Sequence, residues 1–230
     1  MLNTALEYLN KTPLFHMDMI VPIMRGTADI IYASSDGVFL KELESGAFKL
    51  SVSCLSKGKE LIDSVEQEEF CFHQKPLFEY MKQKYDYSEC LICFQAVYNK
   101  KECIRLNTSR LSIRQLTVNY ADIVYENYHY VDYDYIVKRL KNGAIYGGFL
   151  GDELCGFIGI HAEGSMGMLE VFQKHRQKGF AVELEAYMLN EILKNGQIPF
   201  GQIAVDNEPS IKLHKKLGFD ISTDEIYWLF

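Results

Sequence analysis

The sequence predicts an α+β / α/β protein with a mixed, mostly antiparallel central sheet flanked by helices and a smaller N-terminal α+β lobe. Three observations predict this class. An apolar run at 166–172 leads through a glycine-containing turn into a long helical pattern at 180–195. Residues 202–205 begin a second succession of strand and helix. Residues 28–53 hold three runs rich in β-branched and aromatic residues, separated by short turns, which is typical of an antiparallel meander.

The turn after the apolar run has the sequence Arg176-Gln177-Lys178-Gly179-Phe180-Ala181. A strand that enters a turn and then a helix gathers free backbone N–H groups and the positive end of the helix dipole at one point, which favours phosphate. Gly179 allows a positive φ or a close approach of the backbone. Arg176 and Lys178 add positive charge.

A second motif follows at the next strand and helix. Residues 206–210 are typical of a helix start, with a capping side chain and a proline in the first turn. The short helix 210–217 is expected to end at Gly218. Together, Arg176-x-x-Gly179-x-Ala181 and Asn207-x-x-Ser210 followed by Leu217-Gly218-Phe219 resemble the GNAT superfamily of acyl-CoA-dependent N-acyltransferases.

The resemblance covers roughly residues 111–230 and implies a GNAT-like domain at 109–230, preceded by an N-terminal α+β domain at 1–108. It also implies that acetyl-CoA, or another acyl-CoA, is the co-substrate, with its pyrophosphate on the loop and its pantetheine arm along the strand backbone. The cofactor-binding residues expected on this basis are Leu169, Val171, Arg176, Gln177, Lys178, Gly179, Phe180, Ala181, Asn207 and Ser210.

Two positions depart from the family pattern. The family usually has Pro where Gln173 stands, and usually Tyr where His214 stands. That tyrosine is the family's common general acid, so its absence bears on the protonation of the leaving thiolate. His214 is either a substitute acid, since a histidine cation can donate a proton near neutral pH, or a partly exposed histidine without an acid role.

Acyl transfer to an amine also needs a base near the central strand. The nearby candidates are Glu163, His161 and Glu170. Family bases commonly lie early on this strand, which favours Glu163, and Glu170 is second because it faces the opposite side of a regular strand. The alternative for Glu163 is a solvated carboxylate at the end of a hairpin.

Composition limits the function. With 230 residues, 48% hydrophobic, the chain can bury a core, and its net charge of −7 argues against a nucleic-acid partner. Neither a signal-peptide pattern nor a membrane-spanning run is evident, so we expect a cytoplasmic protein.

The pair Cys90 and Cys93 has metal-ligand spacing, but no second pair completes a zinc site. We therefore expect buried structural thiols and no metal.

Local patterns predict the remaining elements. Helices are expected at 4–10, 17–25, 57–69, 75–84, 118–127 and 132–141, and strands at 28–34, 37–43, 48–53, 89–97, 112–116, 144–150, 154–161 and 225–230. The N-terminal order resembles half of the same acyltransferase fold, but it has no cofactor loop.

Six tyrosines between residues 120 and 135 crowd the segment that, by resemblance, covers the acceptor site. They either line a pocket for the acceptor or pack the helices.

Two functions stay open: an N-acyltransferase, most simply an acetyltransferase, for the amine of a small molecule, amino acid or peptide, and a non-catalytic acyl-CoA-binding sensor or regulatory module. The oligomeric state is also open, with a homodimer as one option.

Overall fold

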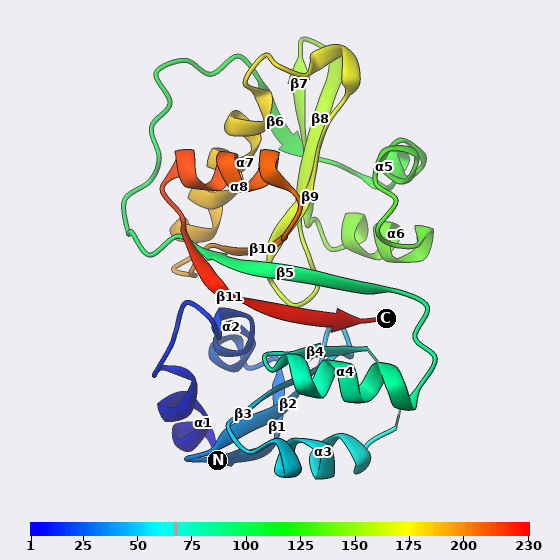
Figure 1. Ribbon diagram of the computed structural model, residues 1–230. Coiled ribbons are helices and arrows are strands. Elements are labelled where there is room, and N and C mark those ends of the chain that lie inside the picture. The colour runs from blue at the N-terminus through cyan, green and yellow to red at the C-terminus, as the bar shows by residue number, and fades with distance from the viewer. Residues whose placement is uncertain (67–68) are drawn as a thin grey trace. The chain divides into compact units, whose positions relative to one another are not determined.

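The computed structural model describes residues 1–66 and 69–230 (Figure 1). These residues form two compact units. The first contains residues 1–97, 202–211 and 220–230, and the second contains residues 98–201 and 212–219. This grouping differs from the expected boundary at 108/109, because two C-terminal segments group with the N-terminal half. Whether 1–108 and 109–230 are separate domains stays a prediction.

The first unit combines four helices with a mostly antiparallel sheet. Its helices are α1 (Leu2–Leu9), α2 (Met17–Arg25), α3 (Leu55–Asp63) and α4 (Lys75–Lys84). Its strands are β1 (Ala28–Ser34), β2 (Gly37–Glu42), β3 (Phe48–Val52), β4 (Phe70–Phe72), β5 (Cys90–Val97) and β11 (Asp220–Leu229). They lie in the order β1-β2-β3-β4-β11-β5, and only the pair β3–β4 is parallel.

Side chains alternate across this sheet and pack against helices on both faces. Phe70 and Phe72 of β4 belong to a core cluster with residues of α3 and α4. Cys71, between them, belongs to a second cluster with Trp228. The side chain of Cys71 therefore points away from α3 and α4.

The second unit is built around an antiparallel meander. Its strands are β6 (Ser112–Gln115), β7 (Ile145–Leu150), β8 (Glu153–Ile160) and β9 (Met166–Val171), and its helical segments are η1 (Val118–Tyr120), α5 (Ala121–Asn127), α6 (Tyr133–Lys141), η2 (Gln173–His175) and α7 (Phe180–Lys194). The elements β10 (Phe200–Ala204) and α8 (Glu208–Leu217) each contribute residues to both units.

The core of the second unit lies between the meander and the helices. Val124 of α5 and Ile136 of α6 pack with Ile145, Phe157 and Met168 from the strands. Helix α7 contacts β7, β8 and β9. The packing holds β9 and the start of α7 in a fixed relation, and this is where the sequence places the cofactor loop.

The two halves of the chain repeat one order of elements. The order α1-α2-β1-β2-β3-α3-β4-α4-β5 corresponds to α5-α6-β7-β8-β9-α7-β10-α8-β11. The pairings also correspond: each half has three antiparallel strands, followed by a parallel pair, β3–β4 or β9–β10. The predicted mixed sheet flanked by helices is confirmed, and the N-terminal half follows the same plan.

Most predicted elements are present with shifted ends. Helix α4 has the expected bounds, whereas β11 begins five residues before the expected strand at 225–230. Helix α3 ends at Asp63, so the expected helix at 57–69 is too long, and residues 67 and 68 of that prediction lie outside the described residues. In the described part of the chain, we find no helix of the length and apolar character that a membrane span requires.

Candidate acyl-CoA site

The loop between β9 and α7 has two residues in the left-handed region. Gln177 has φ 61°, and Gly179, the residue that precedes α7, has φ 85°. A non-glycine residue rarely adopts this conformation, and such strain gathers at functional sites. The alternation turns successive backbone N–H groups toward a common side, as in anion-binding nests.

The backbone N–H groups of the end of this loop and the start of α7 are without a partner among the described residues. Among the described residues, none accepts a hydrogen bond from the backbone N–H groups of residues 177–181. The first bonds of the following helix are made by Val182 and Glu183, both of which donate to the carbonyl of Gly179. Since orphan donors at a helix start are satisfied by ligands or water, the loop can receive an anion.

Arg176 carries the positive charge expected at the loop, but it already has an anionic neighbour. Its Nη2 lies 2.9 Å from Oε1 of Glu170, and its Nε donates to the carbonyl of Val171 at 3.0 Å. The Arg176 side chain is still 60% exposed, so part of the guanidinium faces solvent. Lys178 donates to the carbonyl of Lys174.

Arg110 is a basic residue of this site that the sequence reasoning missed. Its guanidinium donates to the carbonyl of Lys178 and lies 4.7 Å from the centroid of the Phe180 ring. The buried carboxylate of Glu183 accepts the N–H groups of Arg110 and Leu111 at 2.8 and 3.0 Å. Because Arg110 stands 68 residues before Lys178, no local pattern could have placed it here.

The ladder between β9 and β10 is short. Their register among the described residues consists of the single parallel pair Met166 and Gly201, whereas β3 and β4 share three pairs. Leu169 and Val171 lie beyond this pair on β9, so their edge toward β10 carries no ladder. An extended ligand that donates and accepts hydrogen bonds can lie along such an edge.

Strand β9 is irregular, whereas the comparison of Glu163 with Glu170 assumed that side chains alternate regularly along it. Met168 has φ 50°, and the register with β8 shifts between Phe157 and Gly159. A bulge resets the alternation of side chains, so the argument that Glu163 and Glu170 face opposite sides loses its basis. Glu163 lies before the strand, in the turn between β8 and β9.

Glu163 is buried, not a solvated hairpin-end carboxylate. Its side chain accepts a hydrogen bond from the hydroxyl of Ser165, and the residue is 9% exposed. A buried carboxylate that stays close to the central strand can accept a proton.

His161 lies near this carboxylate, and each of its ring nitrogens faces a tyrosine hydroxyl. Its Nδ1 lies 3.1 Å from the hydroxyl of Tyr135 and its Nε2 lies 3.5 Å from that of Tyr128. Burial lowers the pKa of His161, against the opposing effect of the Glu163 charge. Burial and the Glu163 charge raise the pKa of Tyr135. His161, Glu163 and Tyr135 thus influence one another electrostatically beside β9.

The comparisons with known proteins agree with the fold described above. The family model described as FR47-like protein matches residues 145–229. A Drosophila protein solved by a structural genomics consortium has 18% identity and a TM-score of 0.69, over 84% of this chain and 74% of that chain. A GCN5-related N-acetyltransferase-like protein from Streptococcus suis has 12% identity and a TM-score of 0.59, over 97% and 99%.

A GNAT-family acetyltransferase from Colwellia psychrerythraea has 12% identity and a TM-score of 0.54, over 98% of this chain and 97% of that chain. No curated protein matches the sequence. This chain has the GNAT fold. The likeness extends over nearly the whole length, so the N-terminal half belongs to the same architecture.

His214, which the resemblance places where the family usually has tyrosine, belongs to the second unit. It is 6% exposed, and its Nε2 lies 3.2 Å from Oε1 of Glu185. The expectation of a partly exposed histidine is therefore wrong. A Cβ added at Gly201 would lie 3.6 Å from the same nitrogen, so His214 lies beside the pair that joins β9 and β10. Glu185, a carboxylate in the apolar stripe of α7, is explained by this ion pair.

The two remaining predicted cofactor residues lie at the start of α8. The side-chain oxygen of Asn207 accepts the N–H of Ser210 at 3.1 Å, which caps the helix as expected. Both residues group with the first compact unit and the cofactor loop with the second. Their part in cofactor binding stays a prediction.

Proposed function

We propose that this protein transfers an acyl group, most simply acetyl, from acyl-CoA to the amine of a small molecule, amino acid or peptide. The observation that carries the proposal is the row of five unpartnered N–H groups at residues 177–181. A pyrophosphate supplies the acceptors that these donors need, and the dipole of α7 favours its charge.

The remaining parts of the donor have matching surfaces in the second unit. Arg110 and Lys178 flank the loop with positive charge. The unpaired edge of β9 at Leu169 and Val171 suits the amide groups of pantetheine. In the proposed complex, the guanidinium of Arg176 contacts the phosphates, and Glu170 holds this guanidinium in place.

In the proposed reaction, the lone pair of the neutral amine attacks the thioester carbonyl and the carbon–sulfur bond breaks. The departing thiolate takes up a proton and leaves as the free thiol of CoA. Glu163 takes the proton that the amine nitrogen loses, directly or through His161. His214 is the remaining candidate for the proton that reaches sulfur. We expect the reaction to take place in the cytoplasm.

A second function is favoured by one observation. The position of the usual tyrosine acid is filled by His214, which is buried and paired with Glu185. An acid held in this way donates less readily, which suits a module that binds acyl-CoA as a sensor or regulatory partner without turnover.

Release of free thiol from acetyl-CoA in the presence of a panel of amines separates the two functions. An acyltransferase releases thiol only when an accepted amine is present, in amounts equal to the acylated product seen by mass spectrometry. A sensor binds acetyl-CoA and releases no thiol with any amine. A chain that neither binds nor turns over acyl-CoA contradicts both proposals.

A further inference from the structure

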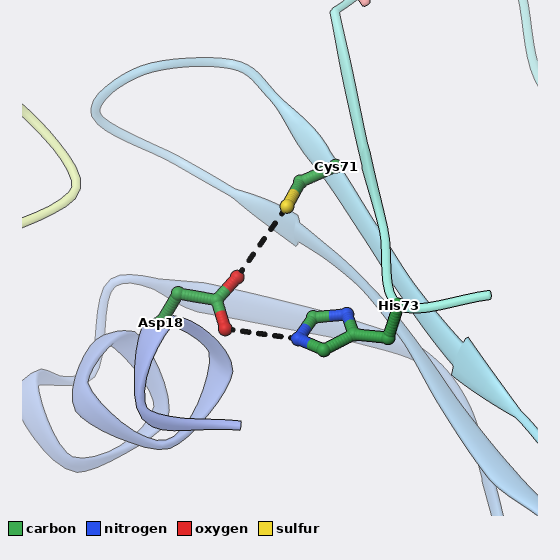
Figure 2. A group of neighbouring side chains, drawn as sticks. All are labelled: Asp18, Cys71 and His73. Atoms are coloured by element: carbon green, nitrogen blue, oxygen red, sulfur yellow. Dashed lines mark hydrogen bonds and ion pairs between the residues drawn. The ribbon is translucent and has the colours of Figure 1, made fainter. Parts of the chain in front are cut away.

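A buried group of metal-ligating side chains lies in the first unit, away from the residues used above. Asp18 comes from α2, Cys71 from β4 and His73 from the position after β4 (Figure 2). One ligand atom from each lies within 4.8 Å of the others, and all three residues are buried. The sequence expectation of no metal considered Cys90 and Cys93 and could not see this group, because Asp18 stands 53 residues before Cys71.

The two ring nitrogens of His73 have different surroundings. Nδ1 lies 3.3 Å from the carbonyl of Leu50, an acceptor for a ring N–H. The other ring nitrogen, Nε2, faces Oδ1 of Asp18 at 3.0 Å. Nε2 is therefore the nitrogen that a metal ion bound to Asp18 would contact.

A zinc ion fits the spacing of the three ligands. Zinc bonds of about 2.0–2.3 Å in tetrahedral geometry place neighbouring ligand atoms roughly 3.3–3.6 Å apart. Nε2 of His73 lies 3.0 Å from Oδ1 of Asp18, and Sγ of Cys71 lies 3.7 Å from Oδ2, the other oxygen of the same carboxylate. All three ligand atoms lie within 4.8 Å of one another, so zinc binding requires the side chains to draw together around the ion. The bond from Nδ1 to a carbonyl is also the usual outer contact of a zinc-binding histidine.

Gln95 supplies a fourth oxygen. Its Nε2 donates to Oδ1 of Asp18 at 2.5 Å, while its Oε1 is buried and has no hydrogen-bond partner within the described ranges. Rotation of the amide by half a turn would turn this oxygen toward the group and give up the hydrogen bond to Asp18. A buried acceptor without a partner is costly, and in the rotated position a metal ion between the two oxygens would satisfy it.

Lys49 is the cation already present, and it does not occupy the position between Asp18 and His73. Its Nζ donates to the carbonyl of Asp18 at 3.1 Å and lies 3.4 Å from Oδ2. It also sits 5.1 Å from the centroid of the Trp228 ring.

We propose that Asp18, Cys71 and His73 bind one zinc ion in a closed structural site, with Gln95 as the fourth ligand. A set of sulfur, nitrogen and oxygen donors in a buried tetrahedral arrangement is typical of zinc. Because the ligands come from α2, β4 and β5, the ion ties the N-terminal helices to the sheet of the first unit.

The test is metal analysis of the purified full chain, refolded with excess zinc and then dialysed exhaustively. We expect one zinc ion per chain, and a thiolate-to-metal charge-transfer band when cobalt replaces zinc. Cys71→Ser should abolish the band and, like His73→Gln, weaken zinc binding by at least about tenfold. Cys93→Ser is the matched control, because Cys93 lies in the same buried cluster without being a ligand, and it should keep both signals.

The wild-type chain decides the matter if the variants do not fold. A folded wild-type chain that retains no zinc and shows no cobalt charge-transfer band would overturn the proposal.

Discussion

Oε1 of Glu170 lies 2.9 Å from Nη2 of Arg176, and this ion pair links the end of β9 to the cofactor loop. The Glu170 side chain is thus turned toward the loop and engaged with the guanidinium. We therefore propose that Glu170 positions Arg176, in place of the second catalytic base that the sequence suggested.

Glu170→Gln should raise the KM for acetyl-CoA and leave kcat within about threefold of the wild type. The reason is that an ion pair at a partly exposed site contributes about 1 kcal/mol or less. Steady-state kinetics with varied acetyl-CoA measures this split. A large fall in kcat at an unchanged KM would instead make Glu170 a catalytic residue.

Glu163 is the proposed base, and its removal should act on the chemical step. Glu163→Gln keeps the size of the side chain and loses the proton acceptor, so kcat should fall by roughly 10²–10⁴-fold. Acetyl-CoA affinity, measured by calorimetry, should not change. The variant Glu153→Gln, at the exposed start of β8, is the control and should keep wild-type turnover. Wild-type kcat in Glu163→Gln would show that another group takes the proton.

The lowered pKa of His161 predicts a pH dependence of stability. Because the folded-state pKa lies below the ordinary value of 6.5, the unfolded chain binds more protons below that pH. The contribution of His161 is therefore fully present above pH 6.5 and is lost as the pH falls. Urea unfolding at several pH values should show a smaller loss of stability in His161→Gln than in the wild type. An equal loss in both would mean that His161 has no such role.

The buried pair of His214 and Glu185 should contribute more to stability than to turnover. His214→Phe leaves Glu185 buried without its partner, and breaking a buried pair costs about 3–5 kcal/mol. The double variant His214→Phe with Glu185→Leu should recover most of this free energy of unfolding. If His214→Phe unfolds like the wild type while kcat falls by orders of magnitude, His214 is the acid and the structural account is wrong.

Sequence patterns were sufficient where the interactions are local. The loop at 176–181, the long helix after it and the cap at Asn207 follow from residues within one or two turns of one another. The mixed sheet and the GNAT resemblance follow from the order of such elements. These features have periodicities and spacings that survive in a single sequence.

Features that depend on distant contacts were not predictable in this way. Arg110 reaches the loop because Glu183 binds the N–H groups of its segment, and no period links the two positions. The bulge at Met168 breaks an alternation that looked regular. The buried state of His214 depends on its pairing with Glu185, a residue of a different helix.

The central claim is that the backbone at 177–181 binds the phosphates of CoA, and two glycines on the same helix test it. Gly179 and Gly196 stand at opposite ends of α7, both have a left-handed φ, and both have room for a Cβ. Valine at either position should therefore cause similar backbone strain, about 1–2 kcal/mol. Only Gly179→Val places a side chain where the backbone must approach phosphate.

Calorimetric titration of acetyl-CoA into the wild type, Gly179→Val and Gly196→Val is the deciding measurement. The account predicts one site per chain in the wild type. In the first unit, β3 and β4 are joined by three residue pairs, which leaves less free strand edge for a ligand, and no comparable loop follows β3 within residues 1–66. It predicts the same site in Gly196→Val and loss of measurable binding in a folded Gly179→Val. Undiminished binding in Gly179→Val, or two sites per chain in the wild type, would contradict it.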